Sequence, residues 1–347
     1  LWSLWAVLLS DSASPAASLT NVGCVTAVTV RRLLNGNEST NTSNNEKEYS
    51  VLSVQKTWTE HQVWLREQAG PKPTAFNTPH RVSAAGDCLR ARGMSALGAM
   101  ESEEFSPQTY MAFAIGNAIH ESIQDALDQD HNDWTFEAEV PIDLTEASKK
   151  VGHGVEEFGL SGHADGILTS IIDGTRTVVE IKTVSSFAAK LAWPAGRATM
   201  GHGPKREHWA QAALYAVGAD ADSVMIVYVS KEGDFRTGIK AGDMQQWVRG
   251  LYEVDEDTGL SLYDLALEEL RHFQYVDRYT RKGMIPPAFV PDDDGSLNLM
   301  HERPEYMAKH GEWRCRYCLH NTTCRSLPAD EVSVDLIELQ PKRNEEV

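Results

Sequence analysis

The stretch Leu160-Ser-Gly-His-Ala-Asp-Gly-Ile-Leu-Thr-Ser-Ile-Ile-Asp-Gly-Thr-Arg-Thr-Val-Val-Glu-Ile-Lys182 decides the fold predicted for this chain. Two apolar runs rich in β-branched residues flank the dipeptide Asp173-Gly174, which is a strong turn signal. The sequence therefore predicts two strands joined by a tight turn.

Three charged residues of the hairpin can converge. Asp165 is expected at the start of the first strand, and Glu180 and Lys182 lie two apart in the second. Side chains alternate along a strand, so Glu180 and Lys182 share one face, while Val179 and Ile181 point into a core. Two carboxylates suit a hard cation such as magnesium or manganese. A lysine beside the metal can orient or help deprotonate a water, or steady a developing phosphate charge. The alternative is a solvated Glu-x-Lys pair, which is common and contributes little.

Composition limits the classes of protein. At 347 residues, the chain can form one large or two ordinary domains with a sizeable core. Its 50 acidic and 32 basic residues give a formal net charge of −18, which excludes a uniformly basic protein that coats DNA. A nuclease can still be acidic overall when its positive charge is local. No apolar run reaches membrane-spanning length, so no membrane association is expected.

Local positive charge occurs in the stretch 183–206. Its glycines and prolines predict an exposed loop. This loop is either merely solvated or a flap that guides a nucleic-acid strand, and its basic residues are Lys190, Arg197, Lys205 and Arg206.

The two ends of the chain differ in sequence pattern from residues 80–328. Residues 1–79 are expected to be a poorly structured leader and linker, with a polar low-complexity segment at 35–50 and a short helix within 51–69. The apolar start lacks both an initiator Met and a preceding positive charge, so a truncated or wrongly started reading frame explains it at least as well as a signal peptide. A cytoplasmic protein is expected. Residues 80–328 should form the folded domain, and residues 329–347 a flexible tail.

Two helices are predicted on either side of the hairpin. Apolar residues recur every three to four positions from Thr109 to Asp128, where Gly116 and His120 are four apart and share a face. A lone histidine is more commonly a core or surface residue than a functional one. Glu207 to Val217 is the second helix, and it carries Gln211 and Tyr215 on one face.

Further elements complete the domain. Trp134 to Val140 reads as a half-buried strand and Val224 to Val229 as a strand buried on both sides. A strand at Phe235 to Ile239 is expected to pair with the latter. Residues 243–282 are expected to be a long helical region, and Ser83 to cap a short helix that carries Cys88.

The cysteines suggest a metal site. Cys315-x2-Cys318-x5-Cys324 is a tight trio, whereas Cys88 and Cys24 lie far upstream. Thiolates at such spacing suggest zinc or an iron–sulfur cluster. A disulfide framework is not expected in a large chain without a secretion signal. For zinc, the fourth ligand would be His320 or His310.

The order of these motifs resembles the RecB-type branch of the PD-(D/E)xK nuclease superfamily. The shared features are Gly116-x3-His120, Gly162-His-Ala-Asp165, Glu180-Ile-Lys182 and Gln211-x3-Tyr215. With the flanking cysteines, residues 80–328 resemble the CRISPR-associated iron–sulfur exonucleases, including phage-encoded relatives, and the iron–sulfur nuclease domains of helicase–nucleases. One departure is Ala164, which stands where a proline usually precedes the aspartate. The resemblance implies an α/β, restriction-endonuclease-like core, with a central mixed sheet flanked by helices and a helical iron–sulfur flank.

The resemblance also implies roles for the site residues. Asp165 and Glu180 would bind magnesium or manganese, with the Ile181 carbonyl and His120 completing the protein ligands. Lys182 would position or activate the attacking water.

Further residues receive roles in the same way. Gln211 and Tyr215 would hold the phosphate backbone or support Lys182. A 4Fe–4S cluster would be held by Cys88, Cys315, Cys318 and Cys324.

The function implied is a magnesium- or manganese-dependent deoxyribonuclease. It would act as an exonuclease on single-stranded or free DNA ends in recombination, repair or CRISPR adaptation, with a helicase, recombinase or CRISPR integration protein as partner. One alternative is a structure-specific endonuclease. Another, from a different class, is a catalytically degenerate nucleic-acid-binding accessory protein.

Overall fold

A computed structural model describes residues 54–69, 79–129, 131–145, 158–193, 203–291, 297–299, 315 and 317–339. Its helices are α1 (Val54–Ala69), α2 (Leu89–Ala96), α3 (Pro107–Leu127), α5 (Ser186–Ala192), α6 (Arg206–Ala219), α7 (Leu262–Thr280) and α9 (Asn321–Ser326), with 3-10 turns η1 (Val82–Ala84) and η4 (Val334–Leu336). Its strands are β1 (His80–Arg81), β2 (Trp134–Asp143), β3 (Leu160–Ser170), β4 (Arg176–Val184), β5 (Ser223–Ser230), β6 (Met244–Gly250), β7 (Met284–Ile285), β8 (Phe289–Pro291), β9 (Leu297–Leu299) and β10 (Val332–Ser333).

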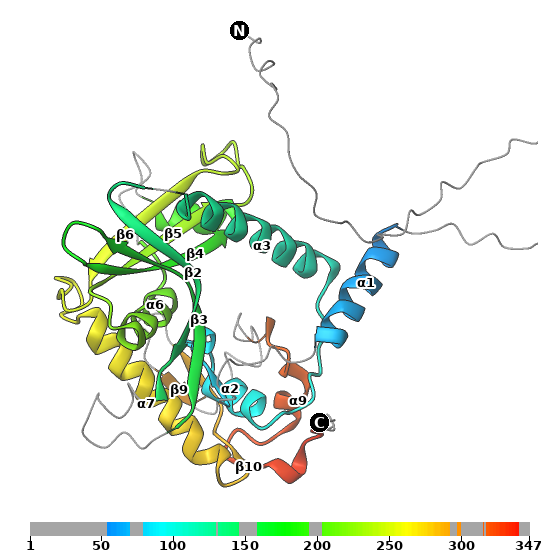
Figure 1. Ribbon diagram of the computed structural model, residues 1–347. Helices are drawn as coiled ribbons and strands as arrows, with labels where there is room; N and C mark the ends of the chain where they lie inside the picture. Colours follow the sequence, from blue (N-terminus) through cyan, green and yellow to red (C-terminus); the bar gives the residue numbers. More distant parts are fainter. Residues whose placement is uncertain are drawn as a thin grey trace, which may run out of the picture. The chain divides into compact units, whose positions relative to one another are not determined.

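The central sheet is mixed (Figure 1). Its strand order is β1-β3-β4-β5-β6, and β2 pairs with β3 outside this path. β3 and β4 form the antiparallel hairpin expected from the sequence, and β4 runs parallel to β5. The predicted α/β arrangement, a central mixed sheet flanked by helices, is confirmed.

The two faces of the sheet have separate cores. On one face, Val179 and Ile181 of β4 are fully buried and pack with Ile119, Ile123 and Leu127 of α3. On the other face, Val178 belongs to the larger core, where α6 packs. The alanines of α6 at positions 210, 212, 213 and 216 are almost fully buried, and their small side chains let the helix lie close to the strands.

The expected strand at Phe235 to Ile239 is wrong. These residues form a turn closed by a single bridge between Asp234 and Ile239, and Phe235 is 91% exposed. β6 (Met244–Gly250) is the antiparallel partner of β5 instead. The helical region expected from residue 243 therefore begins only at Leu262, where Ser261 and Asp264 form a capping box. β6 lies at the end of the strand order, and its pairing with β5 overrides a weak local strand propensity.

Other expectations are refined. Ser83 lies inside η1, and Cys88 occupies the N-cap position of α2 without a side-chain capping bond. The loop expected from residue 183 contains α5, which is capped by Ser185. Ile115 of α3 is 38% exposed rather than buried.

The helix expected within 51–69 is present as α1, while the low-complexity segment at 35–50 lies outside the described residues. Near the other end, Val332 is buried and pairs with Ile285, so ordered structure continues past residue 328. Within the part of the chain that the structure describes, no helix has both the length and the hydrophobicity to cross a bilayer.

Candidate active site

The site lies where the β3–β4 hairpin opens. The ladder runs from Thr169 opposite Arg176 to Gly166 opposite Val179. At the next position, the Oδ2 atom of Asp165 accepts the backbone N–H of Ile181 at 2.6 Å. A side-chain oxygen thus occupies the place of a ladder carbonyl. Asp165 lies in the middle of β3 rather than at its start, because β3 extends back to pair with β2 and β1.

Glu180 and Lys182 share one face of β4, as predicted. Their Oε1 and Nζ atoms are 2.5 Å apart, and the Glu180 side chain is 1% exposed. Lys182 Nζ also donates to Oε1 of Gln211 on α6, at 3.1 Å. The second carboxylate oxygen of Glu180, Oε2, is buried without a hydrogen-bond partner among the described residues.

His120 reaches the site from α3. Its Nδ1 atom is 3.6 Å from Oδ1 of Asp165, and this neighbouring carboxylate raises the pKa of the imidazole, outweighing its burial. Gly116, one turn earlier, makes this approach possible. A Cβ built on Gly116 would lie 3.3 Å from Oγ1 of Thr183 in β4, so α3 crosses β4 closely at this glycine.

Tyr215 supports the other side of the site. It is 2% exposed and hydrogen-bonds to Gln211, and burial raises its pKa. A Cβ built on Gly162 would lie only 2.8 Å from the tyrosine ring, so Gly162 makes room for it. The structure therefore brings together the six residues predicted to form the site, which are His120, Asp165, Glu180, Lys182, Gln211 and Tyr215.

Two residues of the site were missed by sequence reasoning. Gln124, one turn after His120 on α3, donates to the Asp165 carbonyl at 2.8 Å and to the Glu139 carboxylate at 2.9 Å. Glu139 has a positive φ of 48° and is skipped by the β2–β3 register, which places it opposite Asp165. The spacing of Gln124 from His120 was a usable signal, whereas the positive φ of Glu139 left none.

Glu180 and Lys182 each influence the pKa of the other. Burial raises the pKa of Glu180 to about 7, although Lys182 opposes the shift. Burial would lower the pKa of Lys182, but the Glu180 carboxylate outweighs it and the pKa is raised. The Glu180 carboxylate therefore favours the protonated form of Lys182.

The fit of a metal ion rests on the unpaired oxygen. In the described part of the chain, no three His, Cys, Asp or Glu side chains are spaced to hold a metal ion directly. The donor set nevertheless suits a hard divalent cation, because Asp165 and Glu180 extend from adjacent strands and no described residue bonds the buried Glu180 Oε2. A cation would satisfy that oxygen.

Four cysteines were predicted to hold a metal centre, and the structure describes all of them. Cys88, Cys315, Cys318 and Cys324 are free thiols. Burial raises the pKa of Cys324 to about 11, and Cys88 and Cys318 contribute to this shift, so the three thiols lie near one another. Cys24 and His310 lie outside the described residues.

Two neighbours bear on what this cluster can bind. Both ring nitrogens of His320 are occupied, Nε2 with Ser95 Oγ at 3.1 Å and Nδ1 with the Met100 carbonyl at 3.4 Å, which disfavours His320 as a zinc ligand. Arg90 is 1% exposed, and its Nε and Nη2 atoms have no partner among the described residues. Its charge also acts on Cys324. A buried cation with unused donors beside thiols suits an anionic thiolate cluster.

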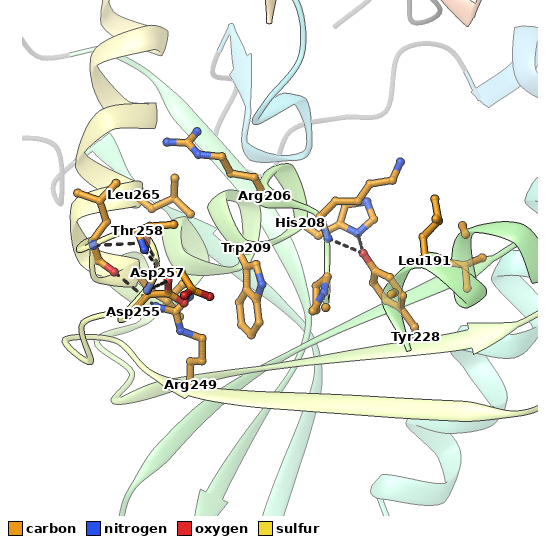
Figure 2. Close-up of a pocket in the computed structure, with 18 of the residues that line it drawn as sticks. Leu191, Arg206, His208, Trp209, Tyr228, Arg249, Asp255, Asp257, Thr258 and Leu265 are labelled. Atoms are coloured by element: carbon orange, nitrogen blue, oxygen red, sulfur yellow. Dashed lines mark hydrogen bonds and ion pairs between the residues drawn. The ribbon is translucent and has the colours of Figure 1, made fainter. Parts of the chain in front are cut away.

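Two of the four predicted DNA-binding residues line a cavity of 1310 Å³ beside the site (Figure 2). Lys205 and Arg206 line this cavity together with His208 and Tyr228. Lys205 pairs with Glu207 at 3.7 Å and Arg206 with Glu268 at 2.8 Å. Lys190 is exposed on α5, and Arg197 lies outside the described residues.

No protein-family model and no curated protein matches the chain. Among solved structures, it is similar to the crystal structure of SSO0001, with 15% identity and a TM-score of 0.43 over 79% of this chain and 96% of that one. It is also similar to the crystal structure of an alkaline exonuclease (LHK-Exo) from Laribacter hongkongensis, with 13% identity and a TM-score of 0.32 over 59% of this chain and 91% of that one. Both TM-scores lie below 0.5, and neither likeness assigns an activity to this chain.

Proposed function

We propose that the chain is a magnesium- or manganese-dependent nuclease that hydrolyses phosphodiester bonds in DNA. The observation that carries the proposal is the buried Glu180 carboxylate, which holds Lys182 with one oxygen, while its other oxygen has no hydrogen-bond partner among the described residues. Two carboxylates with a lysine at their edge suit metal-assisted attack on a phosphate diester.

Each residue of the site has a role in this proposal. Asp165 and Glu180 would hold the cation, with His120 and the Ile181 carbonyl as further ligands. The bound cation supplies positive charge that stabilises the transition state of hydrolysis. Lys182 is aimed by Glu180 and Gln211, so its ammonium can donate to a phosphate oxygen or to the attacking water.

Gln211 and Tyr215 would act through this lysine. Gln211 holds Nζ at 3.1 Å, and Tyr215 hydrogen-bonds to Gln211 from a buried position. Their contribution is to keep the lysine pointed at the reacting phosphate.

The cysteines would hold a structural metal centre. A 4Fe–4S cluster on Cys88, Cys315, Cys318 and Cys324 is favoured over zinc, since the hydrogen bonds of the His320 ring disfavour that residue as a fourth zinc ligand. Such a centre would join the start of α2 to the segment around α9.

The preferred substrate is single-stranded DNA or a free DNA end. End-labelled linear and circular single strands, incubated with and without magnesium or manganese, test this. Degradation of linear strands alone supports an exonuclease, and cutting of circles an endonuclease.

The same assay needs two variants. Lys182→Met should abolish cleavage, whereas Asp173→Asn, which changes an exposed carboxylate in the turn of the same hairpin, should not. Binding without cleavage by the unaltered protein would favour an accessory protein with a degenerate site.

A further inference from the structure

His208 lies between the candidate active site and the cavity. It is on α6, one turn before Gln211, and it lines the cavity shown in Figure 2. Its Nδ1 atom is 2.6 Å from the hydroxyl of Tyr228. Tyr228 is the register partner of Lys182 in the parallel β4–β5 pair, so the histidine is held by the strand next to the lysine.

The direction of these hydrogen bonds is fixed by their donors. The backbone N–H of Lys205 donates to the Tyr228 oxygen at 2.9 Å, since an amide N–H cannot accept. Tyr228 is 1% exposed, so its own proton needs an acceptor, and His208 Nδ1 is the one it reaches among the described residues. Nδ1 is therefore unprotonated, and the neutral ring carries its proton on Nε2.

The surroundings also keep the ring neutral. Burial and the charges of Lys182 and Lys205 lower the pKa of His208 to about 3. Nε2 has no hydrogen-bond partner among the described residues. It is also not one of their fully buried polar atoms that lack a partner, so it is accessible from the cavity side. The side chain thus offers one free N–H donor in a place where two lysines create a positive field.

We infer that the Nε2–H of His208 binds a non-bridging phosphate oxygen of the DNA strand next to the phosphate held at Lys182, and that Tyr228 is the positioning residue that fixes this tautomer. The inference rests on the proposed nuclease function. A neutral donor between two lysines suits an anion, because it adds a hydrogen bond without adding a third repelling charge.

Two substitutions of His208 distinguish the loss of its Nε2–H donor from a loss of folding. In His208→Asn, the short amide can still meet the Tyr228 hydroxyl but offers no donor at the Nε2 position. In His208→Gln, the longer amide reaches that position. Binding of a 5′-fluorescein single-stranded oligodeoxynucleotide, measured in calcium with the full chain, should weaken about tenfold or more in the Asn variant. It should stay within about threefold of the unaltered protein in the Gln variant.

The tautomer is checked without DNA. Nitrogen-15 NMR of the histidine ring should show a neutral ring protonated at Nε2 in the unaltered protein at pH 7, and a mixture of tautomers in Tyr228→Phe. A ring protonated at Nδ1 or on both nitrogens overturns the inference, even if the Asn variant fails to fold.

The DNA measurement separates two failures. Equal binding by the unaltered protein and a folded Asn variant overturns the role of His208 alone. No binding of DNA by the unaltered protein overturns the proposed function, and the phosphate ligand with it.

Discussion

The carboxylate of Asp165 bonds the backbone N–H of Ile181 across the opening of the β3–β4 hairpin, with 2.6 Å between Oδ2 and N. One oxygen of Asp165 thus connects the strands, while Oδ1 faces His120. The candidate cation ligand and the local strand connection are the same side chain, so stability and cleavage can be separated by the choice of substitution.

Asp165→Asn and Asp165→Ala should differ in stability but not in cleavage. The asparagine carbonyl can still accept the Ile181 N–H, whereas alanine leaves this donor unpaired, which costs about 1–3 kcal/mol. Both variants lose a charged cation ligand and should cleave DNA at least about 100-fold more slowly. Urea unfolding and a cleavage assay measure the two effects, and full activity in the asparagine variant would contradict the ligand assignment.

Glu269→Gln should change how stability depends on acid. Burial would raise the pKa of Glu269, but Arg92 at 2.5 Å and the N–H of Gly86 help lower it from 4.5 to about 2. Because the folded-state pKa is depressed, its stabilisation is present above about pH 4.5 and is lost as pH falls toward 2. The variant should lose this part of the pH dependence and about 3–5 kcal/mol at pH 7, measured by urea unfolding between pH 2 and 7.

The control for this prediction is Glu268→Gln. Glu268 pairs with Arg206 at 36% side-chain exposure, so its loss should cost at most about 1 kcal/mol. An equal loss of unfolding free energy in both variants would show that the buried Arg92–Glu269 pair stabilises the fold no more than the exposed Arg206–Glu268 pair.

The cysteine proposal predicts a coloured protein. Protein purified without oxygen should be brown and contain iron and acid-labile sulfide in near-equal amounts. Cys88→Ser and Cys318→Ser should lose the colour, and Arg90→Met should lose it faster in air, because a buried cation no longer faces the anionic cluster. Cys24→Ser and His320→Asn serve as controls and should keep it.

Other outcomes decide between the metals. Stoichiometric zinc in a colourless protein would contradict the iron–sulfur proposal, as would a Cys88→Ser variant with its full cluster.

Salt dependence tests the basic rim of the cavity. Lys205→Gln with Arg206→Gln removes two cations that line it, so the slope of log affinity against log salt for single strands should flatten by about 1.4. Lys56→Gln, on α1, changes an exposed cation outside the cavity and should leave the slope unaltered. An unchanged slope in the double variant would remove these residues from the binding path.

Local pattern predicted the hairpin, α3 and α6, because buried faces impose periods that survive in the sequence. It also placed Glu180 and Lys182 on one face of β4, since strand alternation is strict. β6 was missed because Met244–Gly250 is held by pairing with β5 and not by its own propensity. The spacing of Gln124 from His120 indicated only a shared helix face, because its partner Asp165 lies in another element, as does Tyr228, the partner of His208.

The packing of α2 has a consequence for synthesis on the ribosome. α2 precedes strands β2 to β6 in the chain, yet it packs against α7 and β7 near the other end. The pairings β2–β3 and β3–β4 close short loops and can form early, whereas α2 must wait until residues beyond 260 have left the exit tunnel. A nascent chain stalled after β5 should therefore hold its hairpin against proteases while the segment around Cys88 is still cut. Any centre bound by Cys88 and Cys324 would be loaded only after translation of the domain is complete.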